Sequence, residues 1–423
     1  MKKIKVLVFP CGSEVGLEIY RSLCFSTHIE LIGASSTDDH GGFVYENYYG
    51  KLPFSTSPDF IPQLITLIAE KHIDAVYPAM DSVIELFTSN QHLLGCKIIS
   101  SPHLTNAISL SKKLTYEKLG FTIPVPIIYT ALSDIPGYPV FAKPEIGYGS
   151  RGANKIKNLQ QAETQIAQYP NSIFMEYLPG NEFTIDCFTN KNRELLFCGC
   201  RQRSRIMNGI SVHTATMPLT TGVKKLAEAI NDKMHFRGAW FFQVKENING
   251  DFTLLEVATR LAGSSAVYRC QGINFAMLSV FDAFDKPISV YPNALNVTLD
   301  RALENKYRVQ ITFSKVYIDY DDTVIVNSMV NTLIIKVLFH FINQGKKLIL
   351  ITRHAADIQA SLAKYRLTGL FDEVLHITNQ TPKSNYIDPK HSIFIDDSFE
   401  ERKEVLERLG IPVFAPDAVE SLI

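Results

Sequence analysis

The sequence predicts a multidomain protein that combines α/β and α+β units. Its 423 residues exceed the usual size of one domain, so we expect about two to four domains, each burying its own core. Short apolar runs alternate with helical stretches along most of the chain, a pattern typical of strand–helix units. Several of these runs end in lysines or carboxylates, and open α/β sheets bind their ligands at such strand ends.

Composition and charge exclude several classes of function. A formal net charge of -1 gives no electrostatic footprint for nucleic acid. No apolar stretch reaches membrane-spanning length, and residues 1–9 run into a strand rather than a signal peptide. The seven cysteines are scattered, and no Cys-x-x-Cys metal motif occurs. We therefore expect a cytoplasmic protein that binds neither nucleic acid nor a membrane.

The first part of the chain predicts strands around a glycine turn. The strands lie at 5–9 and 30–34, and the turn begins at Gly12. A full Gly-x-Gly-x-x-Gly pattern is absent, so we do not expect NAD binding. A later strand ends in Asp81. This carboxylate has two interpretations of equal weight: it recognises an amine, or it caps the following helix.

A lysine and a glycine-rich loop begin the central part of the chain. Lys143 follows an apolar strand, and the loop after it contains Gly147, Gly149, Ser150 and Gly152. Glycines let backbone N–H groups approach phosphate oxygens, and lysine adds a point charge. The order differs from a Walker A loop, in which the lysine follows the glycines. From residues 141–152 alone, the two interpretations, a phosphate-binding loop and a simple turn between strands, are about equally favoured.

Further polar residues stand at the ends of neighbouring elements. A helix stops at Gly120, and a strand with a Pro-Gly hinge leads to Glu182. A later strand carries Glu256, with Arg260 just beyond it. Together with Lys143 and its loop, this series resembles the ATP-grasp superfamily over about residues 100–295, especially its carbamoyl-phosphate-synthase-like carboxylate–amine ligases. The first hundred or so residues then resemble the Rossmann-like domain that precedes ATP-grasp domains.

This resemblance implies a binding site for ATP. The residues that it places around the nucleotide are Lys112, Lys143, Gly147, Gly149, Ser150, Gly152, Glu176, Leu178 and Glu182. The lysines would bind the phosphates, and the glycine loop would close over them. Glu176 and Leu178 would border the adenine, and Glu182 would bind the ribose hydroxyls.

The resemblance also implies Mg²⁺ as a cofactor. Gln243 and Glu256 would carry the ion, and Arg260 would lie by the transferred phosphate or the substrate carboxylate. The family pattern at this strand is Glu-x-Asn-x-Arg, whereas the chain has Ala258 in place of the asparagine. Gln243 is also neutral where many relatives have an acid. Fewer charged ligands predict weaker Mg²⁺ binding.

Polar motifs follow apolar runs in the last quarter of the chain. In order they are Asp319-Tyr320-Asp321-Asp322-Thr323, Thr352, Lys383 and Asp396-Asp397. The runs 316–318, 348–351 and 393–395 are short and apolar, which favours buried parallel strands. One carboxylate can attack phosphorus, another can move a proton, and further carboxylates can hold Mg²⁺. The alternative interpretation, that each acidic pair merely caps a strand or a turn, receives about a tenth of the weight.

This set resembles the haloacid dehalogenase-like (HAD) phosphatase superfamily, over about residues 314–423. The resemblance implies that Asp319 is the nucleophile and Asp321 the general acid/base. Thr352 would bind the phosphoryl group, and Lys383 would steady it. The expected ligands of Mg²⁺ are Asp319, Asp321, Asp396 and Asp397. The gaps between the motifs have no room for a lid domain, so the site would be capless and open.

Arginines alternate at positions 201, 203 and 205, so on a strand they would share one face. Either they point into a cleft and suit a carboxylate or phosphate, or they form a solvated edge.

The predicted domains are a Rossmann-like pre-ATP-grasp domain at 1–101, an ATP-grasp domain at 102–295 and a capless HAD-like Rossmannoid domain at 314–423. We expect a bifunctional enzyme: an ADP-forming carboxylate ligase that uses ATP and Mg²⁺, coupled to a phosphohydrolase with an aspartyl-phosphate intermediate. The expected partners are small carboxylate and amine-type substrates and a phosphorylated metabolite, and we also consider a homodimer. One alternative is a phosphatase whose ATP-grasp region only binds nucleotide or substrate. Another is a nucleotide sensor in which neither site turns over.

Overall fold

The chain folds into compact units at Met1–Leu303 and Glu304–Ile423, here called the N-terminal and C-terminal units. The structure is a computed structural model that describes residues 2–147, 149, 151–207 and 209–423. Both units mix helices with strands, which confirms the predicted α/β character. In the part of the chain that the structure describes, no helix is long and apolar enough to cross a membrane.

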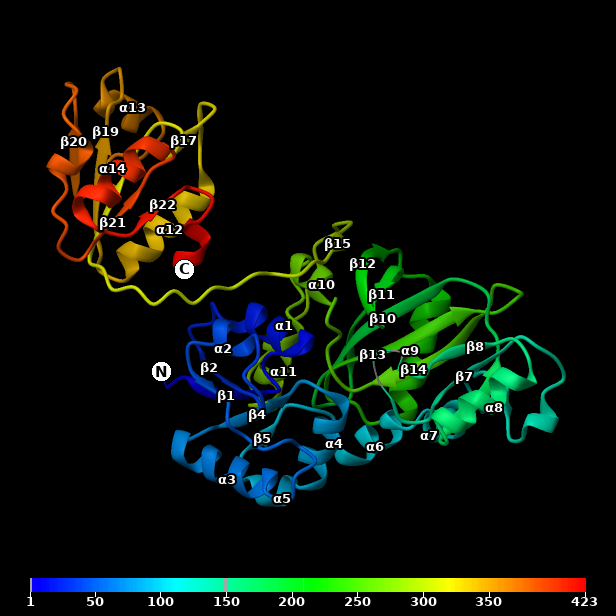
Figure 1. Cartoon of the computed structure of the whole chain (residues 1–423). Helices are drawn as coiled ribbons and strands as arrows, with labels where there is room; N and C mark the ends of the chain where they lie inside the picture. Colours follow the sequence, from blue (N-terminus) through cyan, green and yellow to red (C-terminus); the bar gives the residue numbers. More distant parts are fainter. Residues whose placement is uncertain (1, 148, 150, 208) are drawn as a thin grey trace. The chain divides into compact units, whose positions relative to one another are not determined.

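The N-terminal unit begins with a parallel sheet in the order β3-β2-β1-β4-β5 (Figure 1). Its strands are β1 (Ile4–Phe9), β2 (Ile29–Ala34), β3 (Tyr48–Tyr49), β4 (Ala75–Pro78) and β5 (Lys97–Ile98). The helices between them are α1 (Glu14–Leu23), α2 (Gly41–Val44), α3 (Phe60–Lys71), α4 (Asp81–Ser89) and α5 (Gln91–Leu94).

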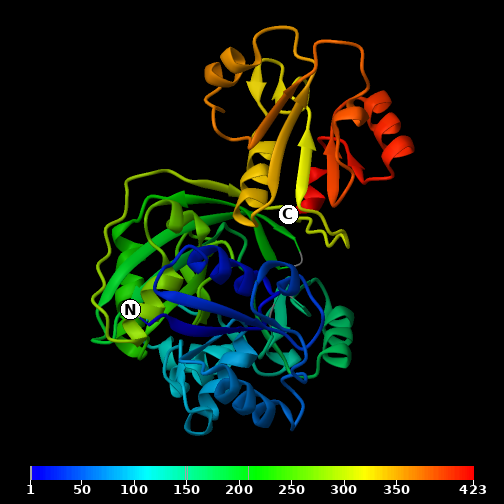
Figure 2. The same cartoon turned by 90° about the vertical axis from the view of Figure 1, so that its left-hand side faces the viewer.

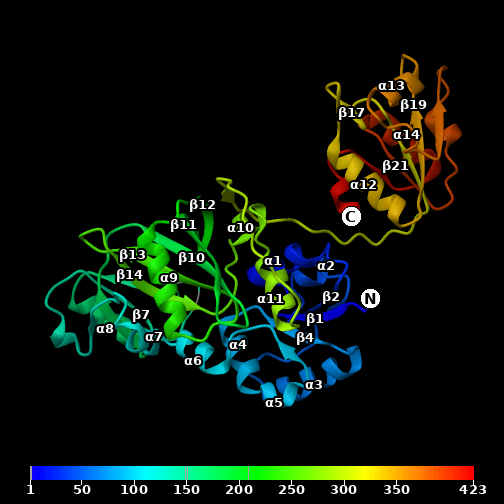
Figure 3. The ribbon, with the colours of Figure 1, turned by 180° about the vertical axis from the view of Figure 1, so that it is seen from behind.

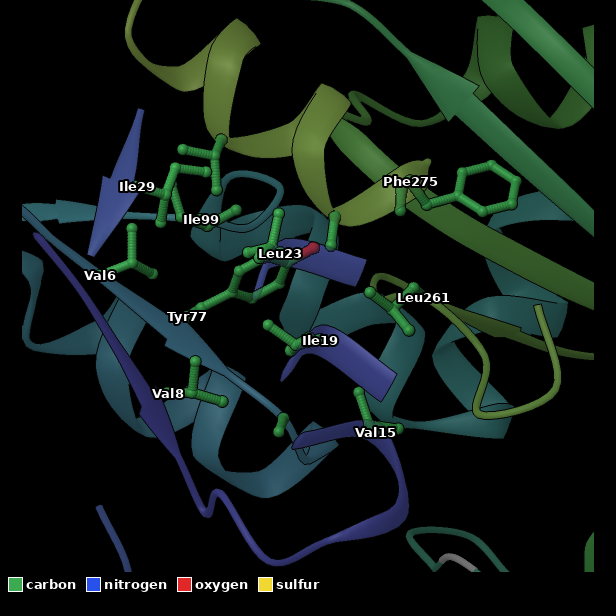
Figure 4. Close-up of a cluster of buried hydrophobic side chains, with 14 of the residues drawn as sticks. Val6, Val8, Val15, Ile19, Leu23, Ile29, Tyr77, Ile99, Leu261 and Phe275 are labelled. Atoms are coloured by element: carbon green, nitrogen blue, oxygen red, sulfur yellow. The ribbon is translucent and has the colours of Figure 1, made fainter. Parts of the chain in front are cut away.

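Successive side chains of β1 point to opposite faces of this sheet, and each face packs against different helices. Val8 belongs to one buried cluster with Ile19 of α1, whereas its neighbour Leu7 belongs to another with Phe60 of α3. Figure 4 shows the first cluster, which also contains Phe275 from α11 (Phe275–Ala283). The parallel sheet therefore shares its core with a helix from much later in the sequence, and both belong to one unit.

Antiparallel sheets form the rest of the N-terminal unit. The smaller sheet has the order β6-β9-β7-β8 and the larger one the order β14-β13-β10-β11-β12-β15. The strands of the smaller sheet are β6 (Ile128–Tyr129), β7 (Val140–Pro144), β8 (Asn154–Ile156) and β9 (Ser172–Glu176). Those of the larger sheet are β10 (Glu182–Thr189), β11 (Leu195–Met207), β12 (Ile210–Met217), β13 (Gly238–Glu246), β14 (Phe252–Ala258) and β15 (Thr298–Asp300). The helical segments are α6 (His103–Leu110), α7 (Lys112–Leu119), η1 (Leu132–Asp134), α8 (Leu159–Gln168), α9 (Thr221–Lys233) and α10 (Ala266–Cys270).

Helix α9 covers one face of the larger sheet (Figure 3). Trp240 and Phe242 of β13 belong to the same buried cluster as Ile230 of α9. Successive side chains of a strand point to opposite faces. Gln243 therefore lies on the face that α9 does not cover, and this face contributes to the candidate site.

The C-terminal unit contains a parallel sheet in the order β20-β19-β16-β21-β22. Its strands are β16 (Lys315–Ile318), β19 (Lys347–Thr352), β20 (Glu373–His376), β21 (Ser392–Ile395) and β22 (Val413–Phe414). The helical segments are α12 (Thr332–Asn343), α13 (Ile358–Lys364), η2 (Lys383–Tyr386), α14 (Phe399–Leu409) and η3 (Val419–Leu422). Helices α12 and α14 pack into separate buried clusters on opposite sides of this sheet (Figure 2).

The strands predicted before the polar motifs are present as β16, β19 and β21. Helix α12 begins at Thr332, directly after a small hairpin of β17 (Ile325–Val326) and β18 (Met329–Val330). This hairpin and α12 occupy the segment between Asp319 and Thr352, and α13, β20 and η2 follow before Asp396.

Candidate functional site

A cavity of about 880 Å³ in the N-terminal unit brings together most of the residues predicted around ATP. The predicted residues that line it are Lys112, Lys143, Gly147, Gly149, Glu182, Gln243, Glu256 and Arg260. Gly152, Glu176 and Leu178 are not part of its lining, and Ser150 lies outside the described residues. Glu176 instead accepts a hydrogen bond from the backbone N–H of Ile127 at 3.0 Å.

The lysines enter the cavity from the ends of β7 and α7. Lys143 Nζ donates to the hydroxyl of Tyr116 at 3.1 Å and to the carbonyl of Leu255 at 3.0 Å. Burial lowers the pKa of Lys143 to about 8, although the charge of Glu256 opposes this shift. Lys112 Nζ donates to the carbonyls of Glu145 and Gly147 at 3.4 and 3.2 Å, and burial also lowers its pKa.

The glycine loop after β7 depends on backbone conformations that side chains disfavour. Gly149 and Gly152 have φ values of 63° and 69°. Gly209, with φ 77°, lies so close that a Cβ on it would stand 2.2 Å from the backbone of Gly149. Glycine at these positions lets the loop contact the turn between β11 and β12.

The larger antiparallel sheet supplies the floor of the cavity. Its register places a row of side chains across β11, β10, β13 and β14, in the order Arg201, Thr184, Gln243 and Glu256. Arg201 is buried and donates from Nε to Asp186 at 2.6 Å. Burial raises the pKa of Asp186, and the Arg201 charge opposes the shift.

Arg203 and Arg205 do not share one environment. Arg203 lines the cavity and donates to Glu182, to Gln243 Oε1 at 3.1 Å and to the carbonyl of Gly209 at 3.1 Å. Arg205 is about half exposed and pairs with Asp300 at 2.8 Å. A register shift between these two arginines changes their relation along β11. The alternating arginines thus divide between the cavity and a solvated edge.

Arg260 and Asp81 close the cavity on the side of the N-terminal parallel sheet. Asp81 is the first residue of α4, and its carboxylate accepts two hydrogen bonds from Arg260, each of 2.9 Å. Burial lowers the pKa of Arg260, but the Asp81 charge outweighs that effect and the net shift is upward. Asp81 therefore both begins a helix and accepts hydrogen bonds from an arginine, and neither of its two predicted interpretations included this ion pair.

The cavity suits a nucleotide better than a metal ion. Among the described residues, six basic side chains line it against four acidic ones, which favours a polyanion. Glu256 can offer a carboxylate to Mg²⁺, but the oxygen of Gln243 already accepts a hydrogen bond from Arg203. Across the described parts of the chain, the group of acidic residues close enough to hold a metal lies in the C-terminal unit.

That group is the acidic cluster of Asp319, Asp396 and Asp397, whose ligand atoms all lie within 4.8 Å of one another. Asp319 follows β16, and the other two follow β21, so neighbouring parallel strands bring them together. Lys383 Nζ donates to Asp319 and to Asp396, both at 2.6 Å. Hard oxygen ligands of this kind fit Mg²⁺.

Burial sets the electrostatics of this cluster. It raises the pKa of Asp319 and that of Asp396, and in both cases the charge of Lys383 opposes the shift. Burial also acts to lower the pKa of Lys383, but its two carboxylate partners outweigh that effect and the net shift is upward. A second cation near these carboxylates would favour their charged forms.

Asp321 follows β16, and Thr352 is the last residue of the neighbouring strand β19. Asp321 is outside the group of potential metal ligands and contacts His354 Nδ1 through both carboxylate oxygens, each at 3.0 Å. Thr352 is fully buried, and its hydroxyl accepts a hydrogen bond from the backbone of His354. His354 was not among the predicted site residues, although its position two residues after Thr352 places it at the same strand end.

Comparisons with known proteins show an ATP-grasp fold, and the matched family lies within the N-terminal unit. Residues 168–303 match a family described as ATP-grasp in the biosynthetic pathway with Ter operon. A search of curated proteins finds no match.

Solved structures resemble the chain at low sequence identity. A biotin carboxylase from Campylobacter jejuni in complex with β-γ-ATP has 16% identity and a TM-score of 0.58, covering 68% of this chain and 72% of its own. The biotin carboxylase domain of 2-oxoglutarate carboxylase from Hydrogenobacter thermophilus, bound to MgADP and bicarbonate, has 15% identity and a TM-score of 0.57, covering 68% and 71%. An L-amino acid ligase from Bacillus licheniformis has 16% identity and a TM-score of 0.56, covering 68% and 75%.

The position of Lys143 gives a direct test of the cavity. We expect Lys143→Ala to weaken binding of a non-hydrolysable ATP analogue by about 1.5–3 kcal/mol, the usual worth of a hydrogen bond to a charged group. Because only the protonated amine is a cation, wild-type affinity should also fall as the pH rises through about 8. Calorimetry measures both effects. Lys157→Ala, at an exposed position outside the cavity lining, is the matched control; equal affinity of both variants and the wild type would mean that Lys143 does not contact the nucleotide.

Proposed function

We propose that the N-terminal unit is an ADP-forming ligase that activates a carboxylate with ATP. The observation that carries this proposal is the convergence of Lys112, Lys143 and Arg260 on one cavity that also exposes Glu256. The cations suit a triphosphate, and the glycine loop suits close approach of its oxygens. The resemblance to a solved L-amino acid ligase, and to carboxylases in complex with nucleotides, supports the same assignment.

The residues have distinct parts in this proposal. Lys112 and Lys143 bind the phosphates, and Glu182 binds the ribose. Arg260 binds the transferred phosphoryl group or the substrate carboxylate. Glu256 would hold Mg²⁺, which when bound neutralises charge on the phosphates.

The proposed reaction has two steps: transfer of a phosphoryl group to the carboxylate, and displacement of phosphate by a nucleophile. A carboxylate oxygen of the substrate attacks the terminal phosphorus of ATP, an acyl phosphate forms, and ADP leaves. An amine or similar nucleophile then attacks the acyl carbon, the new bond forms, and inorganic phosphate leaves with the electron pair. Positioning and charge neutralisation by the cavity are the main contributions of the protein to such a transfer.

We further propose that the C-terminal unit is a phosphohydrolase. The supporting observation is the acidic cluster with Lys383 bonded to both Asp319 and Asp396. Asp319 would attack phosphorus and form an aspartyl-phosphate, while Asp321 gives a proton to the leaving oxygen; water would later hydrolyse the intermediate. Thr352 and Lys383 would steady the phosphoryl group. Mg²⁺ held by the cluster would supply further positive charge.

The presence of both units in one chain suggests that they act on one biosynthetic route, with ligation and dephosphorylation as separate steps. The alternative remains a phosphatase whose ATP-grasp unit only binds nucleotide or substrate, and Ala258 favours that alternative over a fully equipped ligase. The cytoplasmic location, the small-molecule partners and a homodimer stay predictions.

Assays of ADP and phosphate release separate these functions. The full chain is incubated with ATP and pools of amino acids and small carboxylates, with and without Mg²⁺, and separately with a set of phosphorylated metabolites. Substrate-dependent ADP formation supports the ligase. Phosphate release from a metabolite without ADP formation from any pool supports the alternative. Neither product with any pool would support a nucleotide sensor.

A further inference from the structure

Arg203 occupies the position next to Gln243 where a metal ion was predicted. Its Nη1 donates both to Gln243 Oε1 and to Glu182, and its Nη2 donates to the carbonyl of Gly209. The side chain is 9% exposed and lines the cavity. Arg203 is therefore a buried cation held by three groups on the cavity floor.

Arg203 and a magnesium ion would both need the side-chain oxygen of Gln243. A ligating oxygen stands about 2.1 Å from Mg²⁺, so an ion on the Gln243 oxygen would lie within a few ångströms of the guanidinium that donates to the same atom. Two cations at that separation repel, and Gln243 brings no negative charge to offset the repulsion. The site near Gln243 suits one positive charge, and Arg203 already supplies it.

The guanidinium also has the means to bind phosphate. Arginine carries five N–H donors in a rigid fork, and that fork matches phosphate oxygens. Within the described residues, the hydrogen bonds of Arg203 engage three of these donors. The remaining donors belong to a side chain that lines the cavity.

The other acidic side chains of the cavity lining also offer few free carboxylates to a metal ion. Asp81 is bound by Arg260, and Glu14 by Arg301. Glu256 lies near Lys112 and Lys143, whose pKa values its charge raises. Glu256 is thus the acid in the described cavity lining whose carboxylate has no hydrogen-bonded arginine.

We propose that Arg203 binds the phosphates of the nucleotide and carries the positive charge at Gln243, so that Gln243 holds this arginine and does not bind Mg²⁺. This proposal rests on the proposed ATP-binding function of the same cavity. It assigns to Arg203 a binding role and limits the metal site of the N-terminal unit to Glu256.

The first test compares nucleotide affinity with and without metal. Calorimetry with a non-hydrolysable ATP analogue is done in EDTA and in saturating Mg²⁺ on the full chain. We expect Arg203→Met to lose about 10- to 100-fold in affinity in EDTA, the worth of hydrogen bonds to a charged group. The loss in Mg²⁺ should be clearly smaller, because the ion can then use the freed oxygen of Gln243.

Two variants control for folding and for general charge. Arg203→Lys keeps the positive charge but not the fork, so it should bind the analogue in EDTA more tightly than Arg203→Met and more weakly than the wild type. A merely structural role for the guanidinium would not give this order. Arg205→Met removes a neighbouring arginine that pairs with Asp300 outside the cavity, and it should bind the analogue as the wild type does. An equal loss in both conditions for Arg203→Met, or no loss, would overturn the proposal.

The second test follows the metal directly, with Mn²⁺ as the probe and electron paramagnetic resonance as the readout. Only the Mn²⁺ whose binding depends on the analogue is counted, because the acidic cluster of the C-terminal unit can bind the ion by itself. Gln243→Glu should not tighten this Mn²⁺ binding while Arg203 is present, since the new carboxylate pairs with the arginine. In the Arg203→Met background the same change should tighten it. Tighter binding with Arg203 in place would show that the metal sits at position 243 and would refute the proposal.

The proposed function and this inference can fail separately. If the wild type binds no analogue in either condition, the ATP-binding function itself is wrong. If the wild type binds the analogue and Arg203→Met binds it equally well, only the role of Arg203 is wrong.

Discussion

Replacement of Asp319 by asparagine is expected to abolish phosphate release from an aryl phosphate, with a loss of at least about 10⁴-fold. The amide keeps the shape of the carboxylate but cannot act as the nucleophile. It also removes one ligand of the acidic cluster and the charge that Lys383 contacts at 2.6 Å. Binding of the ATP analogue should be unchanged, because Asp319 belongs to the C-terminal unit. Phosphate release and calorimetry measure the two effects.

Asp322→Asn provides a matched control in the same loop. Asp322 is exposed and lies outside the acidic cluster, and its φ of 55° is one that asparagine tolerates. This variant should keep the wild-type rate. Undiminished hydrolysis by Asp319→Asn, or an equal loss in both variants, would contradict a nucleophilic role for Asp319. Where the aryl phosphate is too poor a substrate, the phosphorylated metabolite with the highest wild-type rate takes its place.

The sequence placed Asp319, Asp396 and Asp397 after predicted strands, and the structure brings these three carboxylates together without Asp321. Binding of Mg²⁺ by them stays a prediction. Each apolar run predicts a strand, and parallel strands bring the residues at their carboxyl ends to one edge of the sheet. Asp319 after β16 and Asp396 after β21 meet in this way, since the two strands are direct neighbours. The contact of Asp321 with His354 was not predictable by the same rule, because it depends on side-chain directions at two loops.

The cavity of the N-terminal unit could not be predicted from strand ends in the same way. Lys143 and Glu256 lie on different sheets, so their proximity followed from a family resemblance and not from a pattern in the residues. The pair between Asp81 and Arg260 spans 179 positions and has no local signal. The structure also pairs β15 with β12, although β15 lies between the predicted domains at 102–295 and 314–423.

The alternating arginines show that a register shift in a strand changes which side chains share a face. Period-two alternation correctly groups Arg201 with Arg203 on the cavity face. The register shift that follows Arg203 then separates Arg205 from them. A bulge of this kind leaves little trace in a single sequence, so the alternatives of cleft and solvated edge could not be resolved before the structure was known.

Loss of the carboxylate at Glu256 is expected to remove substrate-dependent ADP formation. Among the described acids of the cavity lining, Glu256 is the one left available to Mg²⁺, since Asp81, Glu14 and Glu182 are bound by arginines. Glu256→Gln keeps the volume and removes the charge, so a loss of about 100-fold or more would reflect the missing metal ligand. ADP release with a substrate that the wild type accepts is the measurement, and the analogue should still bind, because the lysines remain.

Glu228→Gln on the exposed side of α9 controls for the same change of charge and should form ADP at the wild-type rate. Suppose that Glu256→Gln forms ADP as fast as the wild type. Then Mg²⁺ does not act from Glu256, and the cations of the cavity, including Arg203, would have to stabilise the transferred phosphoryl group without a protein-bound ion. Suppose instead that the variant loses both ADP formation and analogue binding. Glu256 would then be needed to keep the lysines charged and in place, because its charge raises the pKa values of Lys112 and Lys143. Only loss of ADP formation with analogue binding retained assigns Glu256 to the metal.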